Sequence, residues 1–164
     1  IVYNFVDMLS HARTEMEVLK ELASNEAAYR SLTFSWFDHS PLLNAIKKLK
    51  EKKVRIIITS DHGTVRVQNP SKIIGDKATT TNLRYKTGKN LNFNEKEVFY
   101  VKNPEEAMLP KSNLSSSYVF AKEDYYFCYP NNYNHFVNYY RNTFQHGGVS
   151  IEEVIVPVAI FESK

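Results

Sequence analysis

Five acidic and imidazole side chains of this sequence stand just beyond predicted strands or helices. They are Asp7, His11, Asp61, His62 and His146. In open α/β sheets, ligands bind outside the carboxyl ends of the strands. Aspartate and histidine, without cysteine, form a donor set that suits Zn²⁺ or Mn²⁺. The sequence therefore predicts a metal site built from these five residues.

The local spacing of the candidates allows two arrangements. Asp7 and His11 are four residues apart, so a turn leading into a helix lets both side chains face one point. Asp61 and His62 are adjacent, and their side chains would point opposite ways in an extended backbone. They reach one ion if the backbone turns, for which Gly63 supplies the freedom. Alternatively, the pair bridges two neighbouring ions.

Each feature also has an interpretation without a metal. Asp7 can be a helix N-cap, and the Asp-His-Gly sequence at 61–63 can be a simple turn. His146 can mark the end of a helix before Gly147 and Gly148. Three such features, each at the exit of a strand or a helix, favour the metal site over these alternatives.

Hydrophobic periodicity indicates the elements that must position these residues. Apolar runs of strand length alternate with amphipathic segments of helical spacing, which predicts an α/β fold with a parallel sheet. Ser40 and Pro41 have the N-cap and first-turn pattern of a helix start. The expected strands are residues 1–6, 54–59, 98–101, 118–121, 125–129 and 154–161, with Pro157 at an edge or bulge of the last. The expected helices are residues 12–23, 26–37, 41–53 and 131–144.

The composition is that of one globular domain. The 164 residues are 43% hydrophobic and 24% charged, with a net charge of +3. No apolar run approaches the ~18 residues of a spanning helix, so no membrane insertion is expected. The single cysteine, Cys128, excludes an internal disulfide framework and fits a cytoplasmic or otherwise reducing compartment, although a cysteine-poor secreted domain would look the same. The apolar start at residues 1–6 predicts a piece of a longer domain.

Three segments together resemble a known family. They are NFVDMLSHARTE, IITSDHGTVRVQNPSKIIGDKATTTNLRYKTGKN and FQHGGVSIEEVIVPVAIFE. They resemble the PglZ branch of the alkaline phosphatase superfamily, and within it the effector domain of PorX-like response regulators, which are two-component proteins associated with type IX secretion. The resemblance covers nearly the whole chain. It implies the C-terminal part of an alkaline-phosphatase-like central sheet flanked by helices, incomplete on its N-terminal side.

The resemblance also implies two zinc ions, with Mn²⁺ as the alternative, and phosphoester hydrolysis. Asp7, His11 and His146 match the family's ligands for one zinc, and Asp61 and His62 match two ligands of the other. The family's remaining Asp ligand and its Thr or Ser nucleophile have no match in this sequence and are expected upstream of it. The chain by itself is therefore expected to be inactive.

The segment at about 64–94 is polar and basic. Between residues 66 and 89 it carries six basic side chains against one acidic one. These are Arg66, Lys72, Lys77, Arg84, Lys86 and Lys89, with Asp76 as the acid. Such charge next to a metal-binding turn predicts a mobile lid over an anionic substrate. Arg84 is the expected phosphate contact, because a guanidinium binds two oxygens at once; an ordinary basic surface loop is the alternative.

Two classes of function follow. The first is a zinc-dependent phosphodiesterase or phosphatase acting on a phosphoester, with an oligonucleotide as one candidate substrate, alongside signalling proteins of a two-component pathway. The second is a non-catalytic regulatory or interaction module, for which a homodimer is one form. Five ligand positions favour the enzyme, because a structural module needs no open two-metal site. The net charge is modest for strong nucleic-acid binding, and the Tyr and Phe clusters are predicted to be mostly core rather than base-stacking surfaces.

Overall fold

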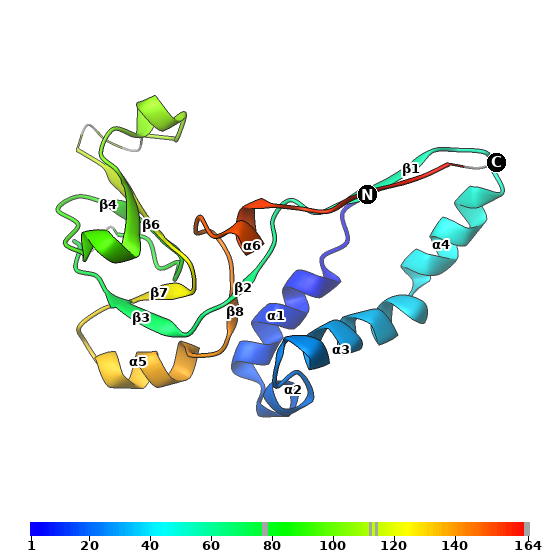
Figure 1. Cartoon of the computed structure of the whole chain (residues 1–164), viewed down its shortest axis with the longest axis horizontal. Coiled ribbons are helices and arrows are strands. Elements are labelled where there is room, and N and C mark those ends of the chain that lie inside the picture. The colour runs from blue at the N-terminus through cyan, green and yellow to red at the C-terminus, as the bar shows by residue number, and fades with distance from the viewer. Residues whose placement is uncertain (77–78, 112, 114, 163–164) are drawn as a thin grey trace. The chain divides into compact units, whose positions relative to one another are not determined.

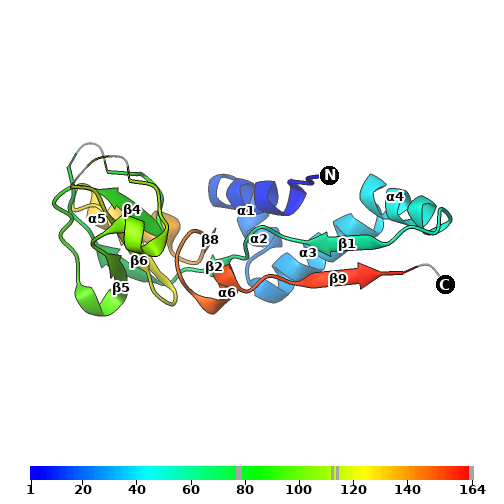
Figure 2. The ribbon, with the colours of Figure 1, turned by 90° about the horizontal axis from the view of Figure 1, so that it is seen from above.

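The computed structural model describes residues 1–76, 79–111, 113 and 115–162. The chain forms two compact units. The first unit comprises Ile1–Asp61 and Val156–Lys164, and the second comprises His62–Ile155. Figures 1 and 2 show the elements of each. None of the helices in the described ranges has the length and apolar character needed to cross a bilayer.

The first unit begins with four helices. They are α1 (Phe5–Glu15), α2 (Glu17–Leu22), α3 (Glu26–Asp38) and α4 (Pro41–Lys50). The side chain of Asn25 accepts a hydrogen bond from Ala28 N–H at the start of α3, and Ser40 accepts one from Leu43 N–H at the start of α4. The helices expected at 26–37 and 41–53 are thus confirmed, and their starts are fixed by local caps.

Aromatic packing joins α1 to α3. The rings of Phe5 and Trp36 stack with centroids 3.9 Å apart, and the Tyr29 hydroxyl donates to the carbonyl of Val6 at 2.9 Å. Strands β1 (Ile56–Thr59) and β9 (Val158–Phe161) complete the unit as an antiparallel two-stranded ribbon. A cavity of about 460 Å³ lies between Trp36 and neighbouring apolar side chains of the helices and β1.

The strand expected at residues 1–6 is wrong. Residues 1–4 belong to no helix or strand and are exposed, and α1 begins at Phe5 with Asp7 in its first turn. A helix provides hydrogen-bond partners for its own backbone N–H and C=O groups, whereas a strand needs a neighbouring strand to do so. The apolar residues at 1–6 do not show whether such a neighbour is present, so they could not distinguish a strand from the start of a helix. The helix expected over 12–23 is divided, because Met16 is extended (φ −110°, ψ 118°) between α1 and α2.

The second unit consists mainly of short strands. Strands β2 (Val65–Arg66) and β8 (Phe144–Gln145) pair antiparallel, and β3 (Asn69–Lys72) and β7 (Tyr125–Cys128) pair parallel. Strand β6 (Ser117–Ala121) lies between β4 (Tyr85–Gly88) and β5 (Val98–Val101) in an antiparallel sheet. The helical segments are η1 (Glu95–Glu97), η2 (Pro104–Ala107), α5 (Tyr133–Tyr140) and α6 (Ile151–Val154).

Two apolar clusters form the core of the second unit. One contains Val65, Val67, Tyr126, Cys128 and Val137, and the other contains Ile73, Val98, Val119, Ala121 and Phe127. The clean alternation of buried and half-buried residues along β6 is the period of two expected of a sheet with one face on a core. Cys128 is buried as expected, and burial raises the pKa of its thiol to about 11.

The α/β class is confirmed, but the strand pairing differs from a single parallel sheet. The described strands form four sheets of two or three strands, and one of these, β3–β7, is parallel. The strand expected at 154–161 is shorter than predicted. Residues 151–154 form α6, and β9 starts only after Pro157, whose missing N–H cannot join a ladder.

The basic segment at 64–94 is not a loose insert. Within it, β2, β3 and β4 take part in sheets, and Val67 and Ile73 are fully buried. Lys86 is 1% exposed, with Nζ 2.8 Å from the carbonyl of Thr80 and 4.7 Å from the Tyr129 ring centroid. The expectation of a lid is corrected for this reason: the segment is part of the core of the second unit. Lys77, one of the predicted basic residues, lies outside the described residues.

Candidate metal centre

Helix α1 carries the first pair of predicted ligands. Asp7 and His11 lie one helical turn apart, and Nε2 of His11 is 3.5 Å from Oδ1 of Asp7. Residues four apart share a helix face, so the predicted common direction of these two side chains is confirmed. Both side chains are solvent-accessible, at 43% for Asp7 and 61% for His11.

The second unit brings together His62 and His146, which are far apart in the sequence. Their imidazole rings stack with centroids 4.0 Å apart and an interplanar angle of 12°. The β2–β8 ladder causes this proximity, because it pairs Val65 with Gln145 and so places the residues before β2 beside those after β8. His146 therefore follows a strand, not the end of the aromatic helix α5.

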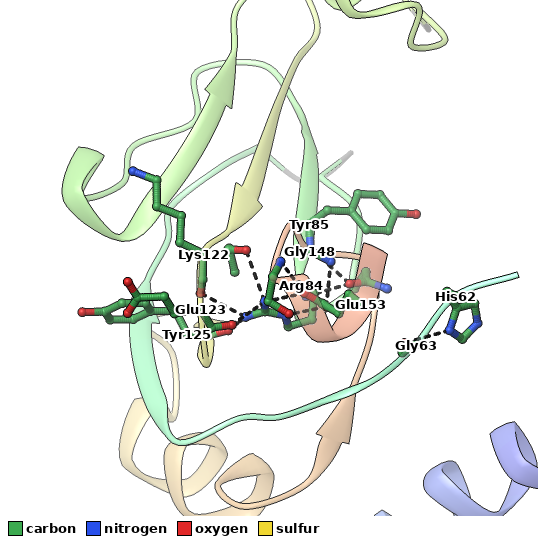
Figure 3. Close-up of polar contacts among 12 residues, drawn as sticks. His62, Gly63, Arg84, Tyr85, Lys122, Glu123, Tyr125, Gly148 and Glu153 are labelled. Atoms are coloured by element: carbon green, nitrogen blue, oxygen red, sulfur yellow. Dashed lines mark hydrogen bonds and ion pairs between the residues drawn. The ribbon is translucent and has the colours of Figure 1, made fainter. Parts of the chain in front are cut away.

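A backbone carbonyl fixes the tautomer of His62. Its Nδ1 lies 3.0 Å from the carbonyl oxygen of Gly63, and this contact is drawn in Figure 3. A carbonyl only accepts, so Nδ1 is the donor in this contact, and in a neutral ring the lone pair is then on Nε2. Metal-ligating histidines are held in this way by a partner on the other ring nitrogen. The geometry suits a ligand that coordinates through Nε2.

Two glycines keep the chain close around this histidine pair. A Cβ on Gly63 would lie 2.0 Å from the carbonyl oxygen of Glu152, so the backbone approach there admits no side chain. Gly147 has φ +104°, a conformation that L residues rarely adopt. The sequence predicted Gly63 for its backbone freedom, whereas the structure requires glycine there because two backbone segments approach closely.

Arg84 is buried. Its side chain is 0% exposed, and its Nε and Nη2 donate to Oε1 and Oε2 of Glu153 at 2.8 and 2.7 Å. Figure 3 shows the guanidinium enclosed by Glu153 and by backbone oxygens. These contacts correct the expectation that Arg84 binds substrate phosphate, because its bidentate carboxylate partner comes from the protein itself.

Glu153 is a buried, charged residue of this region that the sequence analysis did not single out. It is 3% exposed, and its carboxylate also accepts from Gly148 N–H at 2.9 Å and Ser150 N–H at 3.0 Å. Burial by itself would raise the pKa of this carboxyl, but Arg84 and the two N–H groups lower it below its ordinary value. The signal was present in the Ser-x-x-Glu pattern at 150–153, which is that of a capping box.

A comparison with protein families decides the assignment. Residues 1–161 match the BREX system PglZ alkaline phosphatase-like domain. The chain belongs to the PglZ family. None of the curated proteins matches it at a significant level.

For this PglZ chain, the five sequence-predicted ligands stand as follows. Asp7 and His11 form one pair on α1, and His62 and His146 form a second pair in the loops flanking β2 and β8. Asp61 is exposed and directly precedes His62, at the end of the first unit. Carboxylate and imidazole groups of this kind are hard to borderline donors, which fit Zn²⁺ or Mn²⁺.

Proposed function

We propose that the intact PglZ protein holds two zinc ions, with this chain supplying five of their ligands, and carries out zinc-dependent phosphoester hydrolysis. The observation that carries the proposal is the parallel stack of His62 and His146 at 4.0 Å. Two-metal hydrolytic sites hold their ions ~3.5–4 Å apart. Parallel imidazoles at the same separation are suited to presenting one nitrogen to each of two neighbouring ions.

The ligand sets follow the family resemblance. His146, with Asp7 and His11, would hold one ion, and His62, with Asp61, would hold the other. When bound, such ions stabilise the charge on the attacking and leaving oxygens of a phosphoester. Within this chain, the Gly63 carbonyl accepts from Nδ1 of His62 and so orients the ring, for which Nε2 would be the metal-coordinating nitrogen. Mn²⁺ is the alternative occupant of the same donors.

A nucleotide-type substrate is supported by an aromatic row beside the His146 loop. Tyr85 lies against Gly147, where an added Cβ would meet its Cδ1 at 3.0 Å. In the β4–β6–β5 sheet, Tyr85 pairs with Phe120 and Phe120 pairs with Phe99. Phe99 is 52% exposed, so this sheet face offers rings to solvent. Bases stack on such rings whatever their sequence, which makes an oligonucleotide a candidate substrate.

The biological context is also a proposal. The motifs that resemble PorX-like proteins support a role as the cytoplasmic effector domain of a two-component response regulator linked to type IX secretion, working with other signalling proteins. The matched family description names a BREX system domain. A non-catalytic module, including a homodimeric one, would keep the histidine pair without turnover.

Zinc binding by the 164-residue chain tests the proposal. We expect zinc to bind, as measured by mass spectrometry of the native protein, and the bound zinc to fall in His62→Ala and in His146→Ala. His135→Ala is the matched control, because His135 is exposed on α5 and stacks on Tyr139 instead. Zinc binding that survives both substitutions would overturn the assignment.

Hydrolysis of a bis-aryl phosphate tests the reaction. The Thr or Ser nucleophile of the family has no match in this sequence, and the Thr59 hydroxyl donates to the carbonyl of Pro157 at 2.9 Å. We therefore expect zinc binding without turnover by this chain, and turnover by the intact protein with zinc; an intact protein that binds zinc without turnover would favour the non-catalytic module. Turnover that His62→Ala abolishes would assign the nucleophile to the chain itself, and turnover indifferent to His62→Ala would contradict the two-metal proposal.

A further inference from the structure

Glu153 contacts both segments that carry the histidine pair. Its carboxylate accepts from the N–H of Gly148, two residues after His146, at 2.9 Å. Its backbone carbonyl accepts from the N–H of Gly63, the residue after His62, also at 2.9 Å. One residue thus fixes, through two different groups, the loops from which the two imidazoles extend.

The same carboxylate is anchored to the sheet through Arg84. The two side chains form a bidentate ion pair in which both are nearly inaccessible, at 0% and 2% exposure. The remaining guanidinium donors reach backbone carbonyls around the end of β6. These are the carbonyls of Ala121, Lys122, Glu123 and Tyr125. Arg84 therefore fixes Glu153 to β6 and to the turn that leads into β7 (Figure 3).

Close packing leaves this arrangement little freedom to shift. A Cβ on Gly148 would lie 2.6 Å from Nη2 of Arg84 and 2.8 Å from the carbonyl oxygen of Ala121. The next residue, Val149, donates its N–H to that same carbonyl at 3.2 Å. The loop after His146 therefore lies directly on the ion pair and on β6.

We propose that Glu153 and Arg84 are positioning residues that hold His62 and His146 in the stacked arrangement required for metal binding. This inference rests on the proposed function for the metal, while the positioning of the rings is a property of the chain itself. Direct hydrogen-bond partners of metal ligands commonly account for 10–100-fold in metal affinity; Glu153 acts through the backbone of the ligand loops, so this range is the upper bound of its effect. A purely stabilising ion pair would instead affect unfolding and leave the geometry of the rings unchanged.

The test measures the rings and the metal separately, on the 164-residue chain. Histidine ring NMR of the metal-free protein reports the stack, because each ring shields the protons of the other. We expect Glu153→Gln to move the ring resonances of His62 and His146 toward those of an unstacked histidine. In a chelator competition assay, we expect the same variant to bind zinc more weakly, with about 10–100-fold as the upper bound.

Two further variants keep the test decisive. Ile73→Ala is the matched control for lost stability, because Ile73 is fully buried in an apolar cluster of the second unit and its side chain has no polar group with which to hold a loop. The double variant Arg84→Met with Glu153→Met replaces the buried pair by apolar side chains, an exchange that folded proteins often tolerate, while removing the acceptor of Gly148 N–H. We expect it to fold, with the ring resonances moved and zinc bound more weakly.

The outcomes separate this inference from the proposed function. Unchanged ring resonances in the folded double variant, or equal shifts in Ile73→Ala, would overturn the positioning role even if zinc binds the unaltered chain. Shifted resonances in a chain that never binds zinc would support the positioning role and refute the metal function. Weaker zinc binding together with shifted resonances, both absent in Ile73→Ala, supports both.

Discussion

The two units differ in how well their apolar side chains are covered. Among the described residues, three of the fifteen buried apolar side chains belong to the first unit and twelve to the second. Those three are Leu9, Ala23 and Tyr29. In the β1–β9 ribbon of the first unit, Ile57 is 60% exposed and Val158 is 63% exposed. The second unit thus has a core of its own, whereas the first relies on a few helix contacts.

This contrast bears on where a rigid site can be built. A two-stranded ribbon by itself is marginally stable, and elements with few buried contacts open at low free energy. The second unit has two apolar clusters and the buried Arg84–Glu153 pair. We therefore expect the histidine pair of the second unit to be more rigid than the Asp7–His11 pair of α1.

The largest expected effect is on stability, and it compares one phenylalanine of each unit. Phe127 is 1% exposed in the second unit, and Phe34 is 70% exposed in the first. Phe127→Ala should lower the free energy of unfolding by about 3–5 kcal/mol, because it removes a filled core position. Phe34→Ala should stay within about 0.5 kcal/mol. Urea unfolding followed by circular dichroism measures both, and similar costs would mean that the cores do not differ.

The second prediction compares two ion pairs. Glu153→Gln leaves a buried guanidinium without its carboxylate and should cost about 3–5 kcal/mol. In the first unit, Nη2 of Arg55 lies 2.6 Å from Oε1 of Glu162, but the two side chains are 66% and 63% exposed. Glu162→Gln should therefore cost at most ~1 kcal/mol. Unfolding in 0.1 and 1 M salt checks the difference, since screening should weaken only the exposed pair.

The third prediction uses the buried amine of Lys86. Burial lowers its pKa from 10.5 to about 8, so between these values the unfolded chain binds more protons than the folded one. Stability attributable to Lys86 must then rise with pH across that window, by as much as roughly 3 kcal/mol. The deprotonation of Cys128 and the tyrosines opposes this trend in the whole protein. The measurement is therefore the unfolding free energy of the wild type minus that of Lys86→Met. This difference should increase from pH 8 to 10.5. A difference that does not change with pH would mean that the amine is solvated.

The smallest expected effect concerns a helix cap in the first unit. Asn25 caps α3 by accepting from Ala28 N–H at 2.9 Å. Asn25→Ala should lower stability by about 1 kcal/mol. Asn44→Ala, an exposed change inside α4, should be neutral or slightly stabilising, because alanine is the better helix former. Fluorescence of Trp36, the single tryptophan, reports unfolding of the first unit, and equal transitions for both variants would contradict a role for the cap.

Local signals explain what could be predicted from the sequence. Helix α3 and helix α4 were predicted correctly because caps and helical spacing act within a few residues. Asp7 and His11 were predicted to share one direction, since a helix repeats after about one turn. The strands at 98–101 and 125–129 were found from their apolar and aromatic runs. The three sequence segments that resemble PglZ proteins were sufficient to predict the family to which the chain belongs.

Long-range pairing decided the rest. The sequence by itself predicted a set of metal ligands, but the stack of His62 on His146 exists because β2 and β8 pair. The sequence does not show whether a basic residue faces solvent or a carboxylate, so it gave no sign that Arg84 is buried and paired with Glu153. A folded protein tolerates a buried charge only when an opposite charge and hydrogen-bond acceptors, here from residues distant in the sequence, lie next to it. The contact of Arg84 with these partners is a property of the tertiary structure, because the partners do not belong to the local sequence around Arg84.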